Sequence, residues 1–319
     1  MCSSVYALHL VIVRRWKAKD LRDGSTGGYP MRLIIFLSFA LSLTVSADTS
    51  IRVAKPQSEL ELSTGYYLDL LTVVLDKTAR KFGSAKLVFE PVPVSGSLWK
   101  FVLNNKRIDV HWLTPSAAFE SHLKRIPAEI LYGGLGLRGL IIRESRQQEF
   151  LQVKTLDDLR RFTACQGEQW PDVQVLQYAG LKVHRVEKFE SMPDMLRKGR
   201  CDYFPRSVIE GHTELAHQDY SEPEFVFLTS VLLYYPMPVH FYVDPQDKAL
   251  YRRLELGLKA MHDSGELLRF MQQHPVTRHV FDAQRYKNST VLTLHNPALP
   301  SWYRADDFWL TLLGQKPKK

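Results

Sequence analysis

One stretch of the chain decides its fold: residues 155–206 read TLDDLRRFTACQGEQWPDVQVLQYAGLKVHRVEKFESMPDMLRKGRCDYFPR. Apolar runs short enough for buried strands alternate here with segments that carry helix-start and helix-stop residues. The pattern predicts strands at Phe162–Gln166, Val183–Val186 and Cys201–Phe204, with helices at Pro171–Ala179 and Ser191–Lys198. A β-α-β-α-β order is typical of a parallel sheet covered by helices.

A second unit of the same order precedes this stretch. It predicts strands at Ile51–Ala54, Lys86–Val94 and Ile108–Leu113, with helices over 66–82 and Ser95–Asn105. After the stretch, apolar strands at Val226–Tyr235 and Val239–Val243 lead into one long amphipathic helix over 248–272.

The order of elements predicts an α/β protein of two lobes, each with a central, mostly parallel sheet flanked by helices, joined by a two-strand hinge. We expect lobe one to hold residues 48–138 and 230–319, and lobe two to hold residues 139–229. The segment Gly133–Gly139 marks the crossing between the lobes, and its glycines would absorb dihedral changes on closure. Ligands of such sheets bind at the carboxyl ends of strands, near helix N-termini.

The first 47 residues are set apart from the fold. Residues 31–47 carry a positive Arg32, an apolar stretch and a small-residue exit that ends at Ala47. This order is typical of a secretory signal peptide, and the apolar stretch is too short to cross a membrane; the alternative is a buried core helix. We expect residues 1–30 to be an artefactual extension, and cleavage after Ala47 to leave a soluble periplasmic protein.

Composition is that of an ordinary globular protein, with 45% hydrophobic and 24% charged residues. Beyond residue 47 there are 36 basic and 32 acidic side chains, a net charge of +4, which does not predict nucleic-acid binding. Two cysteines remain there, Cys165 and Cys201, without the spacing of a metal site. We place them on neighbouring strands, where geometry favours two buried thiols over a disulfide.

Three motifs carry a family resemblance: Thr155-Leu-Asp-Asp-Leu followed by a strand and Gln166-Gly167, then Leu196-Arg-Lys-Gly-Arg-Cys-Asp202, and Gly265-Glu-Leu. Over about residues 50–280 the chain resembles type II periplasmic solute-binding proteins, in the family-3 branch that feeds amino-acid importers. The resemblance implies the periplasmic binding protein-like II fold and a monomer that captures a small ligand by hinge closure. It also implies no cofactor, no metal, no catalysis, and an inner-membrane ABC permease or a sensor kinase as partner.

The chain departs from this family at two positions. Members carry Thr-x-x-Arg after the third strand, and that arginine holds the ligand carboxylate; here Thr114 is followed by Pro115, Ser116 and Ala117. Members also carry an aspartate four residues after Gly-Arg-x-Asp, which pairs with the ligand ammonium; here Arg206 stands there. A cation replaces an anion, so we expect an anionic ligand such as an organic acid or an acidic peptide-like compound.

Seven residues are candidate ligand-binding residues. Six stand near predicted strand ends and Arg138 stands at the crossing between the lobes: Arg206, Gln166, Gly167, Trp170, Thr114, Trp112 and Arg138. Arg206 offers a guanidinium fork for a carboxylate, and its alternative is an ion pair with Glu210. Arg138 either reaches the ligand or fixes the hinge, and Trp170 either stacks on a flat ligand or packs between the lobes. On the binding hypothesis, Arg206→Ala weakens ligand binding and leaves the stability of the ligand-free protein nearly unchanged.

Neighbouring residues have simpler expected roles. Gly167 permits close backbone approach, Asp172 complements a helix dipole, Ser116 caps a helix and Tyr67 belongs to the core. The chain has no Gly-x-Ser-x-Gly, P-loop or His-Glu-x-x-His motif, so it is not expected to be an enzyme. Two alternatives stay open: a dehydratase-like enzyme with Glu210 or Glu168 as acid or base, and a periplasmic sensor partner.

Overall fold

The strands form three sheets in the computed structural model, which describes residues 48–56, 63–91, 106–215, 224–303 and 308–314. All of these residues belong to one compact unit, Ser46–Lys319. The predicted signal peptide and the predicted helix Ser95–Asn105 lie outside the described residues. Among the described residues, none of the helices is both long and apolar enough to cross a membrane.

The first unit follows the β-α-β prediction. β1 (Thr49–Ala54) pairs in parallel with β2 (Ala85–Glu90), and α1 (Thr64–Phe82) connects them. A separate antiparallel sheet has the order β3-β10-β4. Its strands are β3 (Val110–Leu113), β4 (Lys124–Arg125) and β10 (His240–Val243).

The largest sheet has six strands in the order β11-β9-β5-β8-β6-β7. Their bounds are β5 (Leu137–Arg143), β6 (Thr163–Gly167), β7 (Lys182–Val186), β8 (Tyr203–Ser207), β9 (Phe225–Tyr234) and β11 (Thr290–Thr293). β6 pairs in parallel with β7 and β8, whereas β5 runs antiparallel to both β8 and β9. The predicted lobe boundaries fall inside β5 and β9, which we call the crossing strands, and they stay a prediction.

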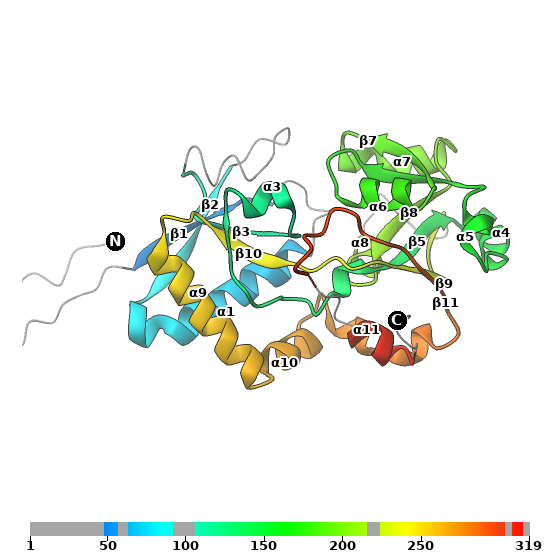
Figure 1. Cartoon of the computed structure of the whole chain (residues 1–319). Helices are drawn as coiled ribbons and strands as arrows, with labels where there is room; N and C mark the ends of the chain where they lie inside the picture. Colours follow the sequence, from blue (N-terminus) through cyan, green and yellow to red (C-terminus); the bar gives the residue numbers. More distant parts are fainter. Residues whose placement is uncertain (1–47, 57–62, 92–105, 216–223, 304–307, 315–319) are drawn as a thin grey trace, which may run out of the picture. The chain divides into compact units, whose positions relative to one another are not determined.

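Two helices cover opposite faces of this sheet (Figure 1) because neighbouring residues of a strand point to opposite sides. Leu140 and Ala164 pack in one buried cluster with residues of α6 (Asp172–Tyr178). Ile141 and Cys165, one residue further along each strand, pack in another with residues of α7 (Met192–Arg197). Both helices begin near the carboxyl ends of strands, which puts their first turns at the edge where a ligand is expected.

The predicted single helix over 248–272 is wrong. The segment forms α9 (Lys248–Asp263) and α10 (Glu266–Gln273), separated at Gly265, whose φ of 68° lies in the left-handed region. A left-handed residue ends an α-helix even where the apolar spacing continues. α1 and α9 pack side by side (Figure 1) through the largest buried apolar cluster.

The other helices in the described residues are short: α3 (Ala117–Glu120), α4 (Gln147–Leu151), α5 (Leu156–Leu159), α8 (Gly211–Leu215) and α11 (Phe308–Leu312), with 3-10 turns at Gly134–Gly136, Glu144–Arg146, Phe189–Ser191, Arg278–Phe281 and Ala283–Tyr286. α5 begins with a capping box: Asp158 accepts from the amide of Thr155 at 2.9 Å, and Thr155 accepts from the amide of Asp158 at 3.2 Å.

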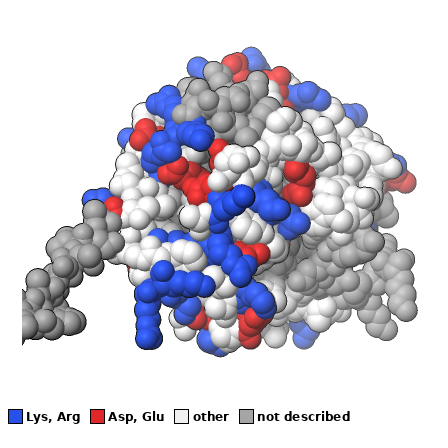
Figure 2. Space-filling view, turned by 60° about the vertical axis from the view of Figure 1, so that its left-hand side comes forward, with Lys and Arg blue, Asp and Glu red and all other residues white. Residues whose placement is uncertain are grey.

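On the face shown in Figure 2, Lys and Arg side chains are interleaved with Asp and Glu side chains. One exposed pair of this kind is Lys259 with Asp263 on α9. Such exposed pairs contribute little to stability. They differ in this respect from the buried ion pairs at the ends of β5 and β8.

Candidate functional site

The carboxyl ends of β6 and β8 lie at one edge of the six-stranded sheet, because these two strands are parallel. β5 runs in the opposite direction, so its first residues reach the same edge, with Arg138 beside Ser207 and Gly139 beside Arg206. Gln166 and Gly167 end β6 there. The structure therefore brings three predicted site residues, at positions 138, 166 and 206, to the edge where open α/β sheets bind ligands.

Arg206 is held by two carboxylates from the segment that follows β8. Its Nε donates to Oε2 of Glu214 at 2.7 Å, and its Nη2 contacts the other oxygen of Glu214. The same Nη2 lies 3.2 Å from Oε1 of Glu210. The side chains of Arg206, Glu214 and Glu210 are buried, with exposed fractions of 7%, 2% and 11%. The ion pair with Glu210 is confirmed, and the two-point pair with Glu214 is an addition that the sequence did not indicate.

Arg138 forms a matching set of contacts. Its Nη2 lies 2.8 Å from Oδ1 of Asp172, and its Nη1 lies 3.3 Å from Oε2 of Glu210. The hydroxyl of Tyr235 donates to the same oxygen of Asp172 at 2.5 Å. Glu210 therefore bridges the two guanidiniums, and Asp172 is a buried partner of Arg138 as well as a first-turn acid. We call these five ionisable residues the network: Arg138, Asp172, Arg206, Glu210 and Glu214.

The network contains two guanidiniums and three carboxyl groups. Burial lowers the pKa of Arg206, but Glu210 and Glu214 outweigh it, so the pKa is raised and the charge is kept. Burial raises the pKa of Glu214; Arg206 opposes that shift and Glu210 increases it. A proton on Glu214 makes the network neutral, and losing that proton leaves one net negative charge.

Two polar groups at this edge have no hydrogen-bond partner within the described ranges. Gln166 is fully buried, at 0% exposure, and neither its Nε2 nor its Oε1 is paired. The Nε of Arg138 is also unpaired. Leaving a buried donor unsatisfied costs about 1–3 kcal/mol. The unpaired amide of Gln166 and the unpaired Nε–H of Arg138 could each donate a hydrogen bond to an acceptor atom of a ligand.

Trp170 packs directly on Gly167 and Arg206. A Cβ on Gly167 would come within 2.7 Å of the indole, so only glycine lets the ring lie this close. The guanidinium carbon of Arg206 lies 4.8 Å from the ring centroid, within range of a cation–π interaction. Trp170 therefore supports the arginine. We expected a ligand to lie against the backbone of Gly167, but the indole of Trp170 lies there.

Trp112 stacks on Tyr67, with ring centroids 4.8 Å apart and planes at 17°. Tyr67 is a buried member of the largest core cluster, as expected. Burial raises the pKa of Tyr67; Glu210 adds to that shift, and Arg138 and Arg206 oppose it. The phenol therefore lies within electrostatic reach of the network, which places the Trp112–Tyr67 pair near it.

The residues after β3 are divided in role. Ser116 caps α3, because its Oγ accepts from the amide of Phe119 at 3.3 Å, and this confirms the expected capping role. Thr114 is half-buried in the connection before it. Within the described residues no cluster of three or more His, Cys, Asp or Glu side chains could hold a metal ion.

Reasoning from the sequence missed Glu214 and Tyr235. Glu214 stands eight positions after Arg206, beyond the spacing at which residues of one helix turn meet. Tyr235 follows a crossing strand and meets Asp172 only because β9 returns beside β5. No local pattern could have identified either residue.

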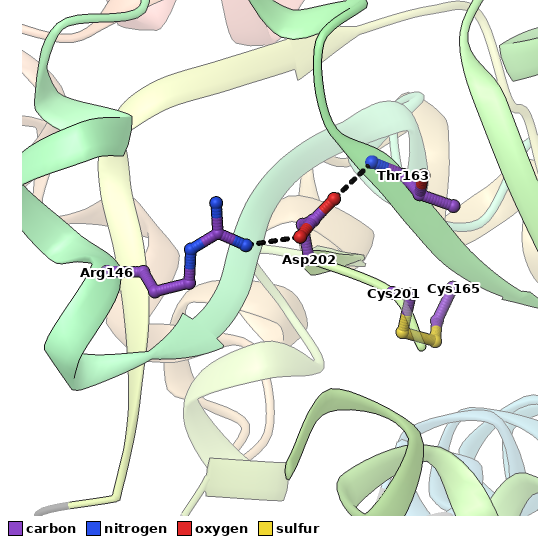
Figure 3. The surroundings of a disulfide bond; sticks show 5 residues. All are labelled: Arg146, Thr163, Cys165, Cys201 and Asp202. Carbon is purple, nitrogen blue, oxygen red and sulfur yellow. Dashed lines mark hydrogen bonds and ion pairs between the residues drawn. A yellow bond between two sulfur atoms is a disulfide. The ribbon is translucent and has the colours of Figure 1, made fainter. Parts of the chain in front are cut away.

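A disulfide joins Cys165, in the middle of β6, to Cys201, just before β8 (Figure 3), so the expectation that favoured two buried thiols over a disulfide is wrong. The predicted strand Cys201–Phe204 begins two residues later, at Tyr203, and Cys201 lies just before it. Cys201 is therefore outside the strand-pair geometry that we expected to disfavour the bond, and the Cα atoms are 5.5 Å apart, a common disulfide spacing.

Asp202 holds the same junction from its other side. Its Oδ2 accepts from the amide of Thr163 at 2.7 Å, and its Oδ1 pairs with Arg146 (Figure 3). β6 and the residues just before β8 are thus joined by a covalent bond at Cys165 and by the half-buried carboxylate of Asp202. Both strands carry site residues at their carboxyl ends, so this junction positions Gln166 and Arg206 relative to each other.

A comparison with protein-family models found no match, and a comparison with curated proteins found none either. Among solved structures, the chain is similar to the probable amino-acid ABC transporter extracellular-binding protein ytmK from Bacillus subtilis. The TM-score is 0.54 at 14% identity, over 73% of this chain and 100% of that one. It is also similar to an ancestral amino acid-binding protein that is a precursor of cyclohexadienyl dehydratase, with a TM-score of 0.51 at 14% identity, over 70% of this chain and 94% of that one.

At these identities the likeness establishes the fold. The chain has the α/β fold of two-lobed periplasmic binding proteins, which confirms the fold class predicted from its β-α-β pattern and its motifs. It leaves the ligand, the partner and the role of each site residue to be argued from this chain's own contacts.

Proposed function

We propose that the protein is an exported solute-binding protein that captures a small ligand and passes it to a membrane partner, an ABC permease or a sensor kinase. The observation that supports this most is the edge of the six-stranded sheet, which carries both the buried network and the buried Gln166 amide, unpaired within the described residues. A structure that needed only stability would replace such an amide by an apolar side chain. The similar solved structures include proteins described as amino-acid-binding.

The ligand should carry one acceptor group, such as a carboxylate, for the Nε of Arg138 and the amide of Gln166. This requirement narrows the anionic ligands expected from the sequence to those with a single acceptor group. The carboxyl groups of the network already neutralise both guanidiniums, so a polyanion would meet repulsion. With a proton on Glu214 the network is neutral, so one anionic group can bind beside it without meeting a net negative charge. We therefore propose a monocarboxylate, or a carboxylate with a compensating positive charge.

Gln166→Leu tests binding separately from stability. Removing an unsatisfied buried amide should leave the ligand-free protein equally or more stable, while ligand affinity falls at least about tenfold for the loss of a hydrogen bond to a charged group. Tyr203→Phe is the matched control, because the Tyr203 hydroxyl is also buried and has no partner among the described residues, but lies at the start of β8. Ligands come from a thermal-shift screen of carboxylates, amino acids and amines. Equal affinity of Gln166→Leu and wild type would refute the assigned role.

Export is tested without a ligand. Expression from Met31 should release a periplasmic protein whose intact mass corresponds to a start at Asp48. A soluble periplasmic product that retains residues 31–47 would refute cleavage after Ala47.

A second candidate function is a dehydratase-like enzyme, and Glu214 is the residue that favours it. A buried carboxyl with a raised pKa beside an arginine can act as a general acid. Of the acids first considered, Glu168 is exposed and Glu210 is engaged by both guanidiniums. Consumption of a bound ligand by wild type, abolished in Glu214→Gln, would establish this alternative.

A further inference from the structure

The end of the chain returns to the crossing strands. β11 pairs in parallel with β9 over four residue pairs, from Thr290 beside Val231 to Thr293 beside Tyr234. The amide of Leu294 extends this ladder by donating to the carbonyl of Tyr234 at 2.8 Å. Residues 289–296 therefore lie along the second half of one crossing strand.

Side chains of this segment hold the same strand and the loop that follows it. The Ser289 hydroxyl donates to the carbonyl of Thr229 at 2.6 Å, and Nδ2 of Asn296 donates to the carbonyl of Pro236 at 2.8 Å. Asn296 is buried, at 4% exposure, and its Oδ1 also accepts from the amide of Ala298. Asn296 is thus a fixed link between the end of the chain and the loop after β9.

α11 covers the lead-in to the other crossing strand. The indole Nε1 of Trp309 donates to the carbonyl of Leu131 at 3.1 Å, and Trp309 is fully buried. A Cβ on Gly134 would come within 2.7 Å of this indole, so the glycine is required for contact with Trp309. Phe308 packs on Tyr132, a non-glycine residue with a φ of 51°. Neighbouring contacts must maintain such a backbone conformation, because it is costly in isolation.

A short path leads from these contacts to the network. Pro236, which Asn296 holds, precedes Met237, and Nη2 of Arg138 lies 2.9 Å from the sulfur of Met237. Tyr235, the residue before Pro236, donates to Asp172. Arg138 itself is the second residue of β5, whose lead-in Trp309 covers. The loop after β9 and the start of β5 both reach the network, and the end of the chain contacts both.

We propose that residues 289–296 and α11 form a strap that holds the two crossing strands together and thereby positions Arg138. Trp309 and Asn296 are its positioning residues. The strap restrains local opening of the strand-end edge in the ligand-free protein. The inference goes beyond ligand capture and does not depend on the identity or existence of the ligand.

Hydrogen–deuterium exchange of the whole protein tests the strap. Wild type is compared with Trp309→Ala, Trp309→Phe and Asn296→Ala, in peptides covering residues 137–143 and 203–214, which contain no strap residue. We expect these peptides to exchange roughly tenfold faster in both alanine variants, as for loss of one buried hydrogen bond and its packing. Trp309→Phe, which keeps a ring but loses the donor, should fall between. If Trp309→Ala does not fold, the comparison of Trp309→Phe and Asn296→Ala with wild type still tests the proposal.

Leu258→Ala is the control for a general loss of stability. Leu258 is fully buried on α9, in the core beside α1, and belongs neither to the strap nor to the two reporter regions. Its removal lowers global stability but should leave exchange in the two reporter regions close to wild type under native conditions. Unchanged exchange there in the strap variants would overturn the proposal, and so would an equal increase in Leu258→Ala.

Discussion

Arg206→Ala should strongly destabilise the ligand-free protein, contrary to the expectation from sequence alone. The substitution leaves Glu214, with 2% side-chain exposure, and Glu210, with 11%, without the guanidinium that both contact. Removing one partner of a buried ion pair costs about 3–5 kcal/mol, because the other charge stays buried without compensation. For a domain of this size, that lowers the melting temperature by roughly 10 °C.

Arg197→Ala is the matched control. Arg197 also makes a two-point contact with a glutamate, with Nε and Nη2 at 2.7 and 2.9 Å from Glu224, but these side chains are 42% and 37% exposed. An exposed pair contributes about 0.2–1 kcal/mol. Urea unfolding followed by circular dichroism compares the two variants at one pH. The geometry of the pairs is alike, so the difference in unfolding free energy reports the effect of burial.

A double substitution separates charge from packing. Arg206→Met with Glu214→Leu removes both partners, and such replacements are often neutral or stabilising. The double variant should therefore recover most of the stability lost in Arg206→Ala. The loss in Arg206→Ala should also grow as pH is raised, since protonation of Glu214 relieves the unpaired charge. A loss no greater than that in Arg197→Ala would refute the reasoning.

Three further outcomes follow from the buried groups. Burial lowers the pKa of His111 to about 4 from 6.5. Between these two pH values His111 is protonated in the unfolded chain but neutral in the folded protein. The free energy of unfolding should therefore fall by up to about 3 kcal/mol as pH falls from 6.5 to 4. His111→Gln should reduce that slope in urea unfolding. Burial raises the pKa of Glu214. The contribution of Glu214 to folding stability therefore declines as pH rises above the ordinary pKa of a glutamate, and Glu214→Gln should flatten that decline in the same assay. Thiol titration of the unfolded, unreduced protein should find Cys165 and Cys201 unreactive, and replacing both with alanine should cost about 4 kcal/mol for opening a loop with a sequence separation of 36. Two reactive thiols at these positions would contradict the disulfide.

Local chemistry made parts of the fold predictable. The capping box of Thr155 and Asp158 begins α5, and Gly180 and Gly199 follow α6 and α7 with positive φ, all set by residues within a few positions of each other. The apolar runs likewise placed β6 and β7 to within a residue. Gly265 shows the limit of this approach: the apolar spacing continued through it, and a single left-handed residue ended α9.

The candidate site also has features that the sequence predicts and features that depend on tertiary contacts. The sequence by itself determined that Gln166 and Arg206 stand at strand ends, because strand order and direction follow from the β-α-β pattern. It put Arg138 at the crossing between the lobes, and only the structure showed that Arg138 opens an antiparallel strand at the same edge. Only the tertiary structure decided their partners. Glu214 meets Arg206, Tyr235 meets Asp172, and Cys201 meets Cys165 across separations that no local spacing encodes. In a buried site, the charge that a ligand meets depends on which carboxylates lie beside each guanidinium, and strand register and the return of distant segments determine this.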